Sequence, residues 1–288
     1  MGVYLCFTQV YPFFCLLFLF ELMTSKGHFD ATLKPPLKWA GGKRWLLPVL
    51  KRYWSKHQQS RLVEPFCGGL SVALGLAPER ALLNDVNPAL INFYQHLSEG
   101  LEVDISFIND ESAYYHCRDE FNQLNAKQNN PARAAQLFYY LNRTGYNGLC
   151  RFNSSGGYNV PFGRYKTINY LESFIDYQPI LSRWQFSCQD FETIPLESMD
   201  FVYADPPYDT PFHQYSQKGF KWEDQERLAL WLSQHDGPVL LSNQATDRII
   251  DLYRQLGFRL RYLDAPRLIS CKGNGRKAVK EVLAIRGF

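Results

Sequence analysis

Short apolar runs alternate with longer amphipathic stretches along the chain from Leu33 onward. Two late segments, residues 258–263 and 278–285, predict a closing hairpin around a loop rich in Lys, Arg and Gly. Because helical stretches separate the earlier apolar runs, we expect an α/β fold in which crossover helices connect a parallel sheet. The predicted buried strands of that sheet are residues 61–66, 81–85, 184–188, 200–205 and 238–242.

Acidic residues stand at or near the ends of three predicted strands. They are Asp85, Asp190 and Asp205. In open parallel sheets, ligands bind beyond the carboxyl ends of the strands. We therefore treat these carboxylates as parts of one candidate site.

One interval is too long for a single crossover. Roughly 100 residues separate Asp85 from the strand that begins at Trp184, far more than one connection needs. The centre of this interval is polar and basic, and a Gly- and Ser-rich stretch follows it. We therefore expect an inserted domain over residues 88–171, with helices from about 88 to 141 and then a turn-rich hairpin.

The first 22 residues differ in character from the rest of the chain. Residues 10–20 are apolar, and Glu21 is the one charged side chain of the segment. The run is short for a membrane span, and it lacks both a preceding Lys or Arg and an A-x-A cleavage site. Three interpretations are open at this point: an upstream extension with Met23 as the working start, a genuine hydrophobic tail, or a segment for secretion or membrane targeting.

The seven cysteines argue against secretion. Their number is odd, their spacing is wide, and no C-x-x-C motif occurs. A disulfide framework or a zinc site would require regular pairs. The pattern indicates buried, reduced thiols in a cytoplasmic protein, and neither the cysteines nor the histidines predict a metal site.

Composition limits the remaining classes. The 288 residues are 46% hydrophobic and 20% charged, which excludes collagen, coiled coil and wholesale disorder. The net charge is only +3, so a nucleic-acid surface has to be local. Basic residues gather between Lys34 and Arg61 and again between Arg259 and Lys280. Such clusters are either solvated faces or contacts to phosphates.

The segment Asp205–Pro206–Pro207–Tyr208 follows a hydrophobic strand. Two prolines force a rigid, extended exit from the strand. A carboxylate and a backbone carbonyl held side by side can accept both hydrogens of an exocyclic amine, and the ring of Tyr208 offers a stacking surface. The motif therefore indicates a site for a nucleobase amino group, with a plain turn as the alternative.

Two glycine-containing turns suggest a cofactor. Residues 64–71 place Gly68 and Gly69 directly after a strand, and Asp85 follows about 20 residues later, where an acid binds ribose in nucleotide folds. No G-K-[ST] follows at phosphate-loop spacing, so we expect a nucleoside cofactor without a pyrophosphate. In residues 37–43, Trp39 can pack on a cofactor while Lys43 reaches a carboxylate, although the residues alone favour a plain loop with a packed Trp.

Taken together, the motifs resemble those of the Dam-type DNA adenine-N6 methyltransferases of the D12 class. In chain order they are K-W-A-G-G-K, E-P-F-x-G-G, N-D-x-N, N-R-x-G-Y-N-G-L-x-R, F-G-R-Y and D-P-P-Y, between Leu37 and about Leu283. The resemblance implies a Rossmann-like methyltransferase sheet with helices on both faces and S-adenosylmethionine as the cofactor. It also implies methylation of adenine N6 in double-stranded DNA, within GATC, by base flipping and direct in-line transfer. Neither a metal, a stable membrane association nor a particular protein partner is implied.

The family's functional residues map onto matching positions of this chain. The implied catalytic residues are Asp205, Pro206 and Tyr208. The implied cofactor-binding residues are Trp39, Lys43, Glu64, Phe66, Gly68, Asp85, Asp190, Phe191 and Asp205. The implied DNA-binding residues are Lys38, Tyr146, Asn147, Leu149, Arg151, Pro161 and Arg164. The insert then becomes the target-recognition domain, and residues 23–87 and 172–288 form the catalytic domain.

Two departures from the family pattern qualify this assignment. Leu70 stands where a second spaced glycine is common, so the turn there is expected to differ in shape, and the stretch from Asp209 to Phe220 is short. A methyltransferase acting on cytosine N4 or RNA is an alternative that the insert disfavours. A non-catalytic DNA-binding regulator is a second alternative. The presence of both Asp85 and Asp205 argues against it, because a protein that only binds DNA has no need of both. Because every motif begins at or after Leu37, the resemblance favours a dispensable extension over residues 1–22.

Overall fold

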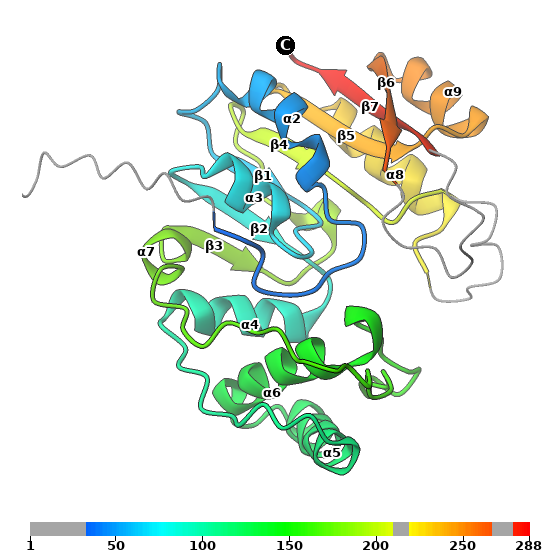
Figure 1. Cartoon of the computed structure of the whole chain (residues 1–288). Helices are drawn as coiled ribbons and strands as arrows, with labels where there is room; N and C mark the ends of the chain where they lie inside the picture. Colours follow the sequence, from blue (N-terminus) through cyan, green and yellow to red (C-terminus); the bar gives the residue numbers. More distant parts are fainter. Residues whose placement is uncertain (1–32, 210–218, 267–278) are drawn as a thin grey trace, which may run out of the picture. The chain divides into compact units, whose positions relative to one another are not determined.

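Seven strands form one mixed sheet in the computed structural model, which describes residues 33–209, 219–266 and 279–288 (Figure 1). Their spatial order is β3-β2-β1-β4-β5-β7-β6, in which β7 runs antiparallel to both neighbours and the other pairs are parallel. The predicted parallel sheet and closing hairpin are therefore confirmed. The strands are β1 (Leu62–Glu64), β2 (Ala81–Asn84), β3 (Trp184–Ser187), β4 (Phe201–Ala204), β5 (Val239–Gln244), β6 (Arg259–Ala265) and β7 (Val279–Arg286).

Alternate residues of each central strand enter two separate cores. In β4, Phe201 and Tyr203 join one core, and Val202 and Ala204 join the other. This double burial explains why these strands read as continuous apolar runs. The first core is covered by α2 (Leu47–Trp54), α3 (Ser71–Leu76) and α4 (Pro88–Ser98), and the second by α8 (Trp222–Ser233) and α9 (Asp247–Gln255). Helices thus cover both faces, as expected.

The chain reverses its direction across the sheet between β1 and β4. From β1 it continues outward to β2 and β3, and it then returns to place β4 on the other side of β1. Such a reversal opens a crevice at the carboxyl ends of the two strands, because their connections leave in opposite directions. Glu64 ends β1 and Asp205 follows β4, so two predicted site residues flank that crevice.

The long interval between β2 and β3 is helical at first, as predicted. Besides α4 it holds α5 (Glu111–Lys127), α6 (Pro131–Thr144), the short η2 (Tyr146–Gly148) and α7 (Gln178–Leu181). The side chains of Asn87, Asp110 and Asn130 cap the first three of these helices by accepting backbone N–H groups. Beyond α6, antiparallel bridges join Gly145 to Phe162 and Phe152 to Tyr158, which is the expected hairpin.

Helix α4 connects this helical region to the sheet. It contacts both β3 and α6, and its Phe93 stacks on Tyr139 of α6 with ring centroids 5.8 Å apart. Residues 33–288 form one compact unit, and the first core continues from the sheet into the helical insert. Two further short helices lie close to the cavity described below: η1 (Arg44–Leu46) and η3 (Phe191–Thr193).

Several sequence features lie outside the described residues, namely the apolar run at 10–20, most of the short stretch 209–220 and the tip of the closing hairpin. Within the described ranges, no helix combines the length and the apolar character that a membrane crossing requires. Four cysteines fall in these ranges and all are free thiols: Cys67, Cys117, Cys150 and Cys188.

Candidate active site

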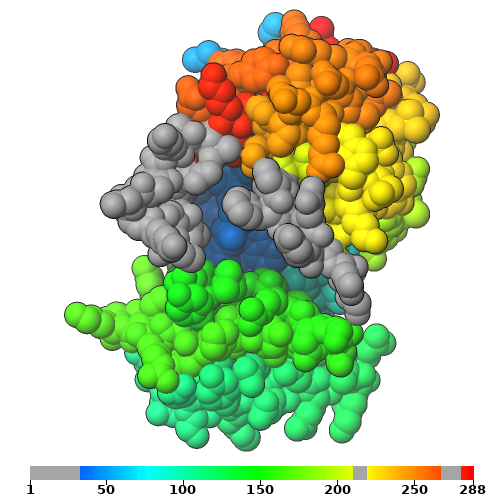
Figure 2. Space-filling view, turned by 90° about the vertical axis from the view of Figure 1, so that its right-hand side faces the viewer, coloured from blue at the N-terminus to red at the C-terminus, as the bar shows by residue number. Residues whose placement is uncertain are grey.

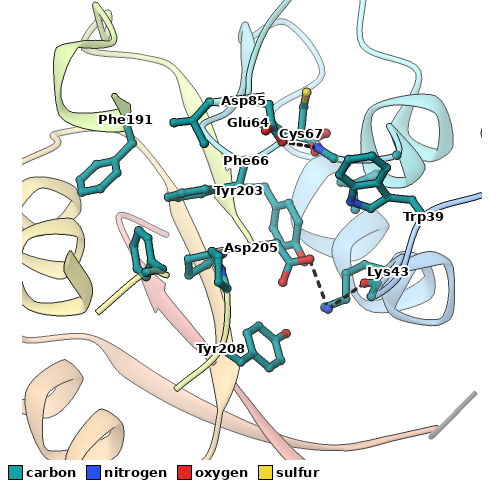
Figure 3. A pocket seen from close by; sticks show the side chains of 18 of the residues that line it. Trp39, Lys43, Glu64, Phe66, Cys67, Asp85, Phe191, Tyr203, Asp205 and Tyr208 are labelled. Carbon is teal, nitrogen blue, oxygen red and sulfur yellow. Dashed lines mark hydrogen bonds and ion pairs between the residues drawn. The ribbon is translucent and has the colours of Figure 1, made fainter. Parts of the chain in front are cut away.

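A cavity of about 730 Å³ opens where β1, β2 and β4 end (Figure 3). It is lined by each residue expected to bind the cofactor and by each expected catalytic residue. The structure thus brings together side chains from widely separated parts of the sequence. They are Trp39, Lys43, Glu64, Phe66, Gly68, Asp85, Asp190, Phe191, Asp205, Pro206 and Tyr208.

The turn after β1 is shaped by the indole of Trp39. A Cβ atom on Gly68 would lie 2.7 Å from Nε1 of Trp39, and one on Gly69 would lie 2.7 Å from its Cβ. Gly68 also has a φ of +44°. Only glycine allows the backbone to approach the ring this closely. Leu70 follows with a φ of +59° and is fully buried, so it adopts the left-handed conformation that a glycine would take there more easily.

The carboxylate of Asp85 is fixed by backbone groups. Its Oδ2 accepts from the N–H of Gly68 at 3.2 Å, and its Oδ1 accepts from the N–H of Asn87 at 3.0 Å. Burial raises its pKa, which those two hydrogen bonds oppose. A carboxylate has about four acceptor positions, so Asp85 retains capacity for hydroxyl groups in the cavity.

Asn84 has a role that sequence reasoning missed. Its amide nitrogen donates to the carbonyls of Pro65 and Gln189, each at 3.0 Å, and its Oδ1 accepts from Ser187 Oγ at 2.9 Å and from the N–H of Gln189 at 3.1 Å. The side chain is fully buried. It therefore ties together the segments that leave β1, β2 and β3. The signal in the sequence was the asparagine directly before the strand-end acid.

Aromatic rings form one wall of the cavity. The rings of Phe66 and Phe191 lie 5.7 Å apart, and Phe220 lies 5.6 Å from Phe66. Arg227 of α8 places its guanidinium 4.5 Å from the Phe191 ring and donates to Asp190 Oδ2 at 2.9 Å. This arginine was not predicted, and it holds Asp190 and Phe191 in place from across the cavity rim.

Asp205 and Lys43 form an ion pair inside the cavity. Lys43 Nζ lies 3.2 Å from Asp205 Oδ2, and it donates to the carbonyl of Gly41 at 3.0 Å (Figure 3). The other oxygen of Asp205, Oδ1, is buried without a hydrogen-bond partner. Burial raises the pKa of Asp205 to about 6, while the charge of Lys43 opposes that rise. We had expected Lys43 to reach a carboxylate, and in this structure the carboxylate is that of Asp205.

Two further acidic groups face the same space. Glu64 is buried, its Oε1 has no hydrogen-bond partner, and burial together with the nearby Asp205 raises its pKa well above the usual range. Glu281 of β7 accepts a hydrogen bond of 2.8 Å from the hydroxyl of Tyr208. Lys43 Nζ also lies 4.6 Å from the centroid of the Tyr208 ring. The cavity therefore combines an excess of acidic side chains with an aromatic ring held at its edge.

A second cavity, of about 850 Å³, adjoins the first on the side of the helical insert. Trp39, Lys43 and Glu281 line both cavities. Figure 2 shows the blue N-terminal segment lying deep between the green insert and the orange and yellow C-terminal elements. Of the predicted DNA-binding residues, those that line this cavity are Tyr146, Asn147 and Leu149.

The remaining predicted DNA-binding side chains lie outside that lining. Lys38 is half-buried and donates to the carbonyl of Arg143 at 2.9 Å, and burial together with Arg143 lowers its pKa to about 8. Arg151 is exposed and donates to Asn159 Oδ1 at 2.7 Å. Arg164 is exposed and pairs with Glu111 at 2.9 Å. Pro161 is exposed, and its carbonyl accepts from the N–H of Tyr146 at 2.9 Å.

Comparison with known proteins identifies the family. The model of the D12 class N6 adenine-specific DNA methyltransferases matches residues 39–267. The chain belongs to this class. It is 38% identical to the Retron Ec67 DNA adenine methylase of Escherichia coli, over 87% of this chain and 90% of that protein. It is 37% identical to the DNA adenine methylase of Escherichia coli strain K12, over 86% of this chain and 94% of that protein. A type II methyltransferase of Lactococcus lactis is 34% identical, over 87% and 94% of the two chains.

The methyl donor of this adenine-specific methyltransferase is S-adenosylmethionine, and the cavity fits it. The donor carries positive charge on its sulfonium and ammonium groups. The unpartnered buried oxygens of Glu64 and Asp205 offer the complementary negative charge. Asp85 has acceptor capacity for ribose hydroxyls, and the wall around Phe66 and Phe191 suits a planar base. Among the described residues, His, Cys, Asp and Glu side chains form no group able to hold a metal ion.

Proposed function

We propose that this methyltransferase acts on adenine within GATC in duplex DNA, and that it flips the base out of the helix and methylates N6 by direct transfer. The observation that carries the proposal is the buried, unpartnered Oδ1 of Asp205, placed at the end of β4 beside the ring of Tyr208. An acceptor in that state is ready for a hydrogen-bond donor from a ligand, since leaving it unsatisfied costs about 1–3 kcal/mol.

We infer base flipping because the catalytic carboxylate has to reach the N6 amino group of adenine. The N6 amino group of a paired adenine lies inside the duplex, and Asp205 lies in a cavity at the sheet edge, so the base has to leave the stack at a cost of a few kcal/mol. Tyr146 is 47% exposed and lines the adjoining second cavity. We assign to Tyr146 the filling of the space that the extruded base leaves.

The catalytic loop acts on the nucleophile. An adenine amino group is a weak nucleophile because its lone pair is delocalised into the ring. Oδ1 of Asp205 and the carbonyl of Pro206 accept the two N6 hydrogens, which favours a more tetrahedral nitrogen and stabilises the positive charge that develops there. Tyr208 stacks on the base and holds its plane. S-adenosylmethionine supplies an activated methyl group on sulfur, and alignment of N6 with that methyl group accounts for much of the rate.

The helical insert provides recognition in this proposal. We assign target recognition to residues 88–171 and chemistry to residues 23–87 and 172–288. Within the insert, we assign a phosphate contact to Asn147 and contacts with the recognised bases and their backbone to Leu149, Arg151, Pro161 and Arg164. Outside the insert, we assign a base contact to Lys38. The motif from Asn142 to Arg151, which resembles that of Dam-type enzymes, supports GATC as the site. Helix α4 also packs on β3, so it anchors the insert to the sheet.

The test of the chemistry is an Asp205→Ala variant. We expect methylation of duplex DNA to be abolished, while DNA binding in a gel-shift assay stays near the wild-type level. Asp251→Ala, an exposed acid on α9, is the matched control and should retain full activity. Near-normal turnover of Asp205→Ala would overturn the assignment of this loop.

The test of the target site uses methylation-deficient cells. Plasmid from cells that express the protein is digested with nucleases that cut only methylated or only unmethylated GATC. We expect protection from the nuclease specific for unmethylated sites and cleavage by the other. Full sensitivity to the former enzyme, with soluble protein present, would contradict GATC methylation.

A further inference from the structure

Two buried amides hold the backbone on either side of Tyr208. Nε2 of Gln225 donates to the carbonyl of Pro207 at 2.8 Å. The N–H of Asp209 donates to Oδ1 of Asn243 at 3.1 Å. Tyr208 therefore sits between two fixed peptide groups, one directly before it and one directly after it.

The two amides also bind each other. Nδ2 of Asn243 donates to Oε1 of Gln225 at 2.9 Å and to the hydroxyl of Tyr253 at 3.0 Å. Oδ1 of Asn243 accepts a second hydrogen bond, from the N–H of Gln244 at 2.9 Å. Both donors and both acceptor positions of Asn243 are thus occupied. Gln225 is 3% exposed and Asn243 is fully buried.

The amide pair lies behind the catalytic loop. Neither Gln225 nor Asn243 lines the cavity, so neither contacts a ligand there. Gln225 comes from α8, Asn243 from β5 and Tyr253 from α9. Three elements that are separate in the sequence therefore converge behind the loop that follows β4.

Burial makes this arrangement selective for one loop conformation. A shift of the loop would break the hydrogen bonds of Pro207 and Asp209 with the amide pair. Each buried polar group left unpaired costs about 1–3 kcal/mol, and the amide pair can reach no solvent that would replace the loss. An apolar core would impose no such directional requirement on the loop.

We propose that Gln225 and Asn243 are positioning residues for methyl transfer, which set the location of the Tyr208 ring by holding the peptide groups on both sides of it. This inference rests on the function proposed above for the loop. The residues act on the rate of transfer and not on the binding of S-adenosylmethionine, because neither lines the cavity and both contact the loop through its backbone.

The test is a double-mutant cycle between Gln225→Met and Tyr208→Ala. Methionine keeps the approximate size of glutamine and removes the donor to Pro207. We expect Gln225→Met to slow single-turnover methyl transfer about 10- to 100-fold, since misplacement by about 1 Å has that effect. The dissociation constant for S-adenosylmethionine should stay near the wild-type value. In the Tyr208→Ala background the same change should add little, because its effect passes through Tyr208.

Controls separate this inference from the proposed function. Glu226→Met, the exposed neighbour on α8, should keep the wild-type rate. If Tyr208→Ala transfers methyl groups normally, the proposed role of Tyr208 fails. If Tyr208→Ala is slow while Gln225→Met is normal, or if the two losses are additive, the positioning role alone is overturned. Should Gln225→Met unfold at the assay temperature, Gln225→Glu takes its place in the cycle, because it retains the acceptor for Asn243 and lacks the donor to Pro207.

Discussion

The ammonium nitrogen of Lys43 lies 3.2 Å from Oδ2 of Asp205, although 161 residues lie between the two in the sequence. Lys43 is 6% exposed, so this contact is shielded from solvent. The pairing leaves Oδ1 of Asp205 for the target amine. The positive charge of Lys43 also favours the ionised form of this carboxyl group near neutral pH. It therefore links the cofactor turn to the catalytic loop electrostatically.

The first prediction concerns the pH dependence of methyl transfer. Asp205 has a pKa of about 6, and its ionised carboxylate accepts a hydrogen from N6 at Oδ1 while Oδ2 pairs with Lys43. The single-turnover rate at saturating S-adenosylmethionine should fall as the pH decreases through about 6. Lys43→Met should move this midpoint to higher pH, because the ammonium lowers the pKa of Asp205, whereas Glu281 raises it. A midpoint that stays unchanged or moves lower in Lys43→Met would contradict this assignment.

The second prediction is a gain of stability from Glu64→Gln. Burial raises the folded-state pKa of Glu64 above its unfolded value, so the folded protein binds this proton more tightly. Stability is therefore lost as the pH rises from the unfolded-state pKa of Glu64 toward its folded-state pKa. Above the folded-state pKa the full loss of stability applies. Glutamine removes that penalty, so the unfolding temperature at neutral pH should rise while affinity for S-adenosylmethionine falls. Scanning calorimetry checks this against exposed Glu79→Gln, and a lower unfolding temperature in Glu64→Gln would refute it.

The third prediction compares two glycines of the cavity. Gly68→Ala places a Cβ atom 2.7 Å from the Trp39 indole in a left-handed conformation, and it should cost about 1–3 kcal/mol of stability. It should also weaken binding of S-adenosylmethionine. Gly42→Ala meets its nearest neighbour at 3.8 Å and should change little. Denaturant titration and isothermal calorimetry measure both effects, and equal outcomes for the two variants would exclude the close approach of Trp39 as the reason for Gly68.

The fourth prediction concerns base choice. Arg151 is exposed and is oriented by Asn159 at 2.7 Å and 3.1 Å, which leaves its guanidinium partly available. Arg151→Ala should reduce discrimination against near-cognate sites by about 1–3 kcal/mol, the value of a bidentate base contact. Competition binding with duplexes that differ at one base pair measures this change. A uniform loss of affinity on all duplexes would make Arg151 a phosphate contact instead.

The sequence by itself determined the secondary structure and the location of the site. The apolar runs became the strands of the sheet, because burial on both faces requires continuous apolar residues. The acids Asp85, Asp190 and Asp205 line one cavity, because strands of a parallel sheet present their carboxyl ends at one edge. The order of the motifs gave the family, which the match over residues 39–267 establishes.

Only the tertiary structure decided which polar groups pair within that site. Three sets of contacts join residues from separate elements. They are the ion pair of Lys43 with Asp205, the hydrogen bonds of Asn84, and the hydrogen bonds of Gln225 and Asn243 to the catalytic loop. A hydrophobic pattern is local and repeats along the chain, so it predicts elements. A hydrogen bond depends on the position of two atoms to within a few tenths of an ångström, and those positions exist only after the sheet and its covering helices have closed around the loop.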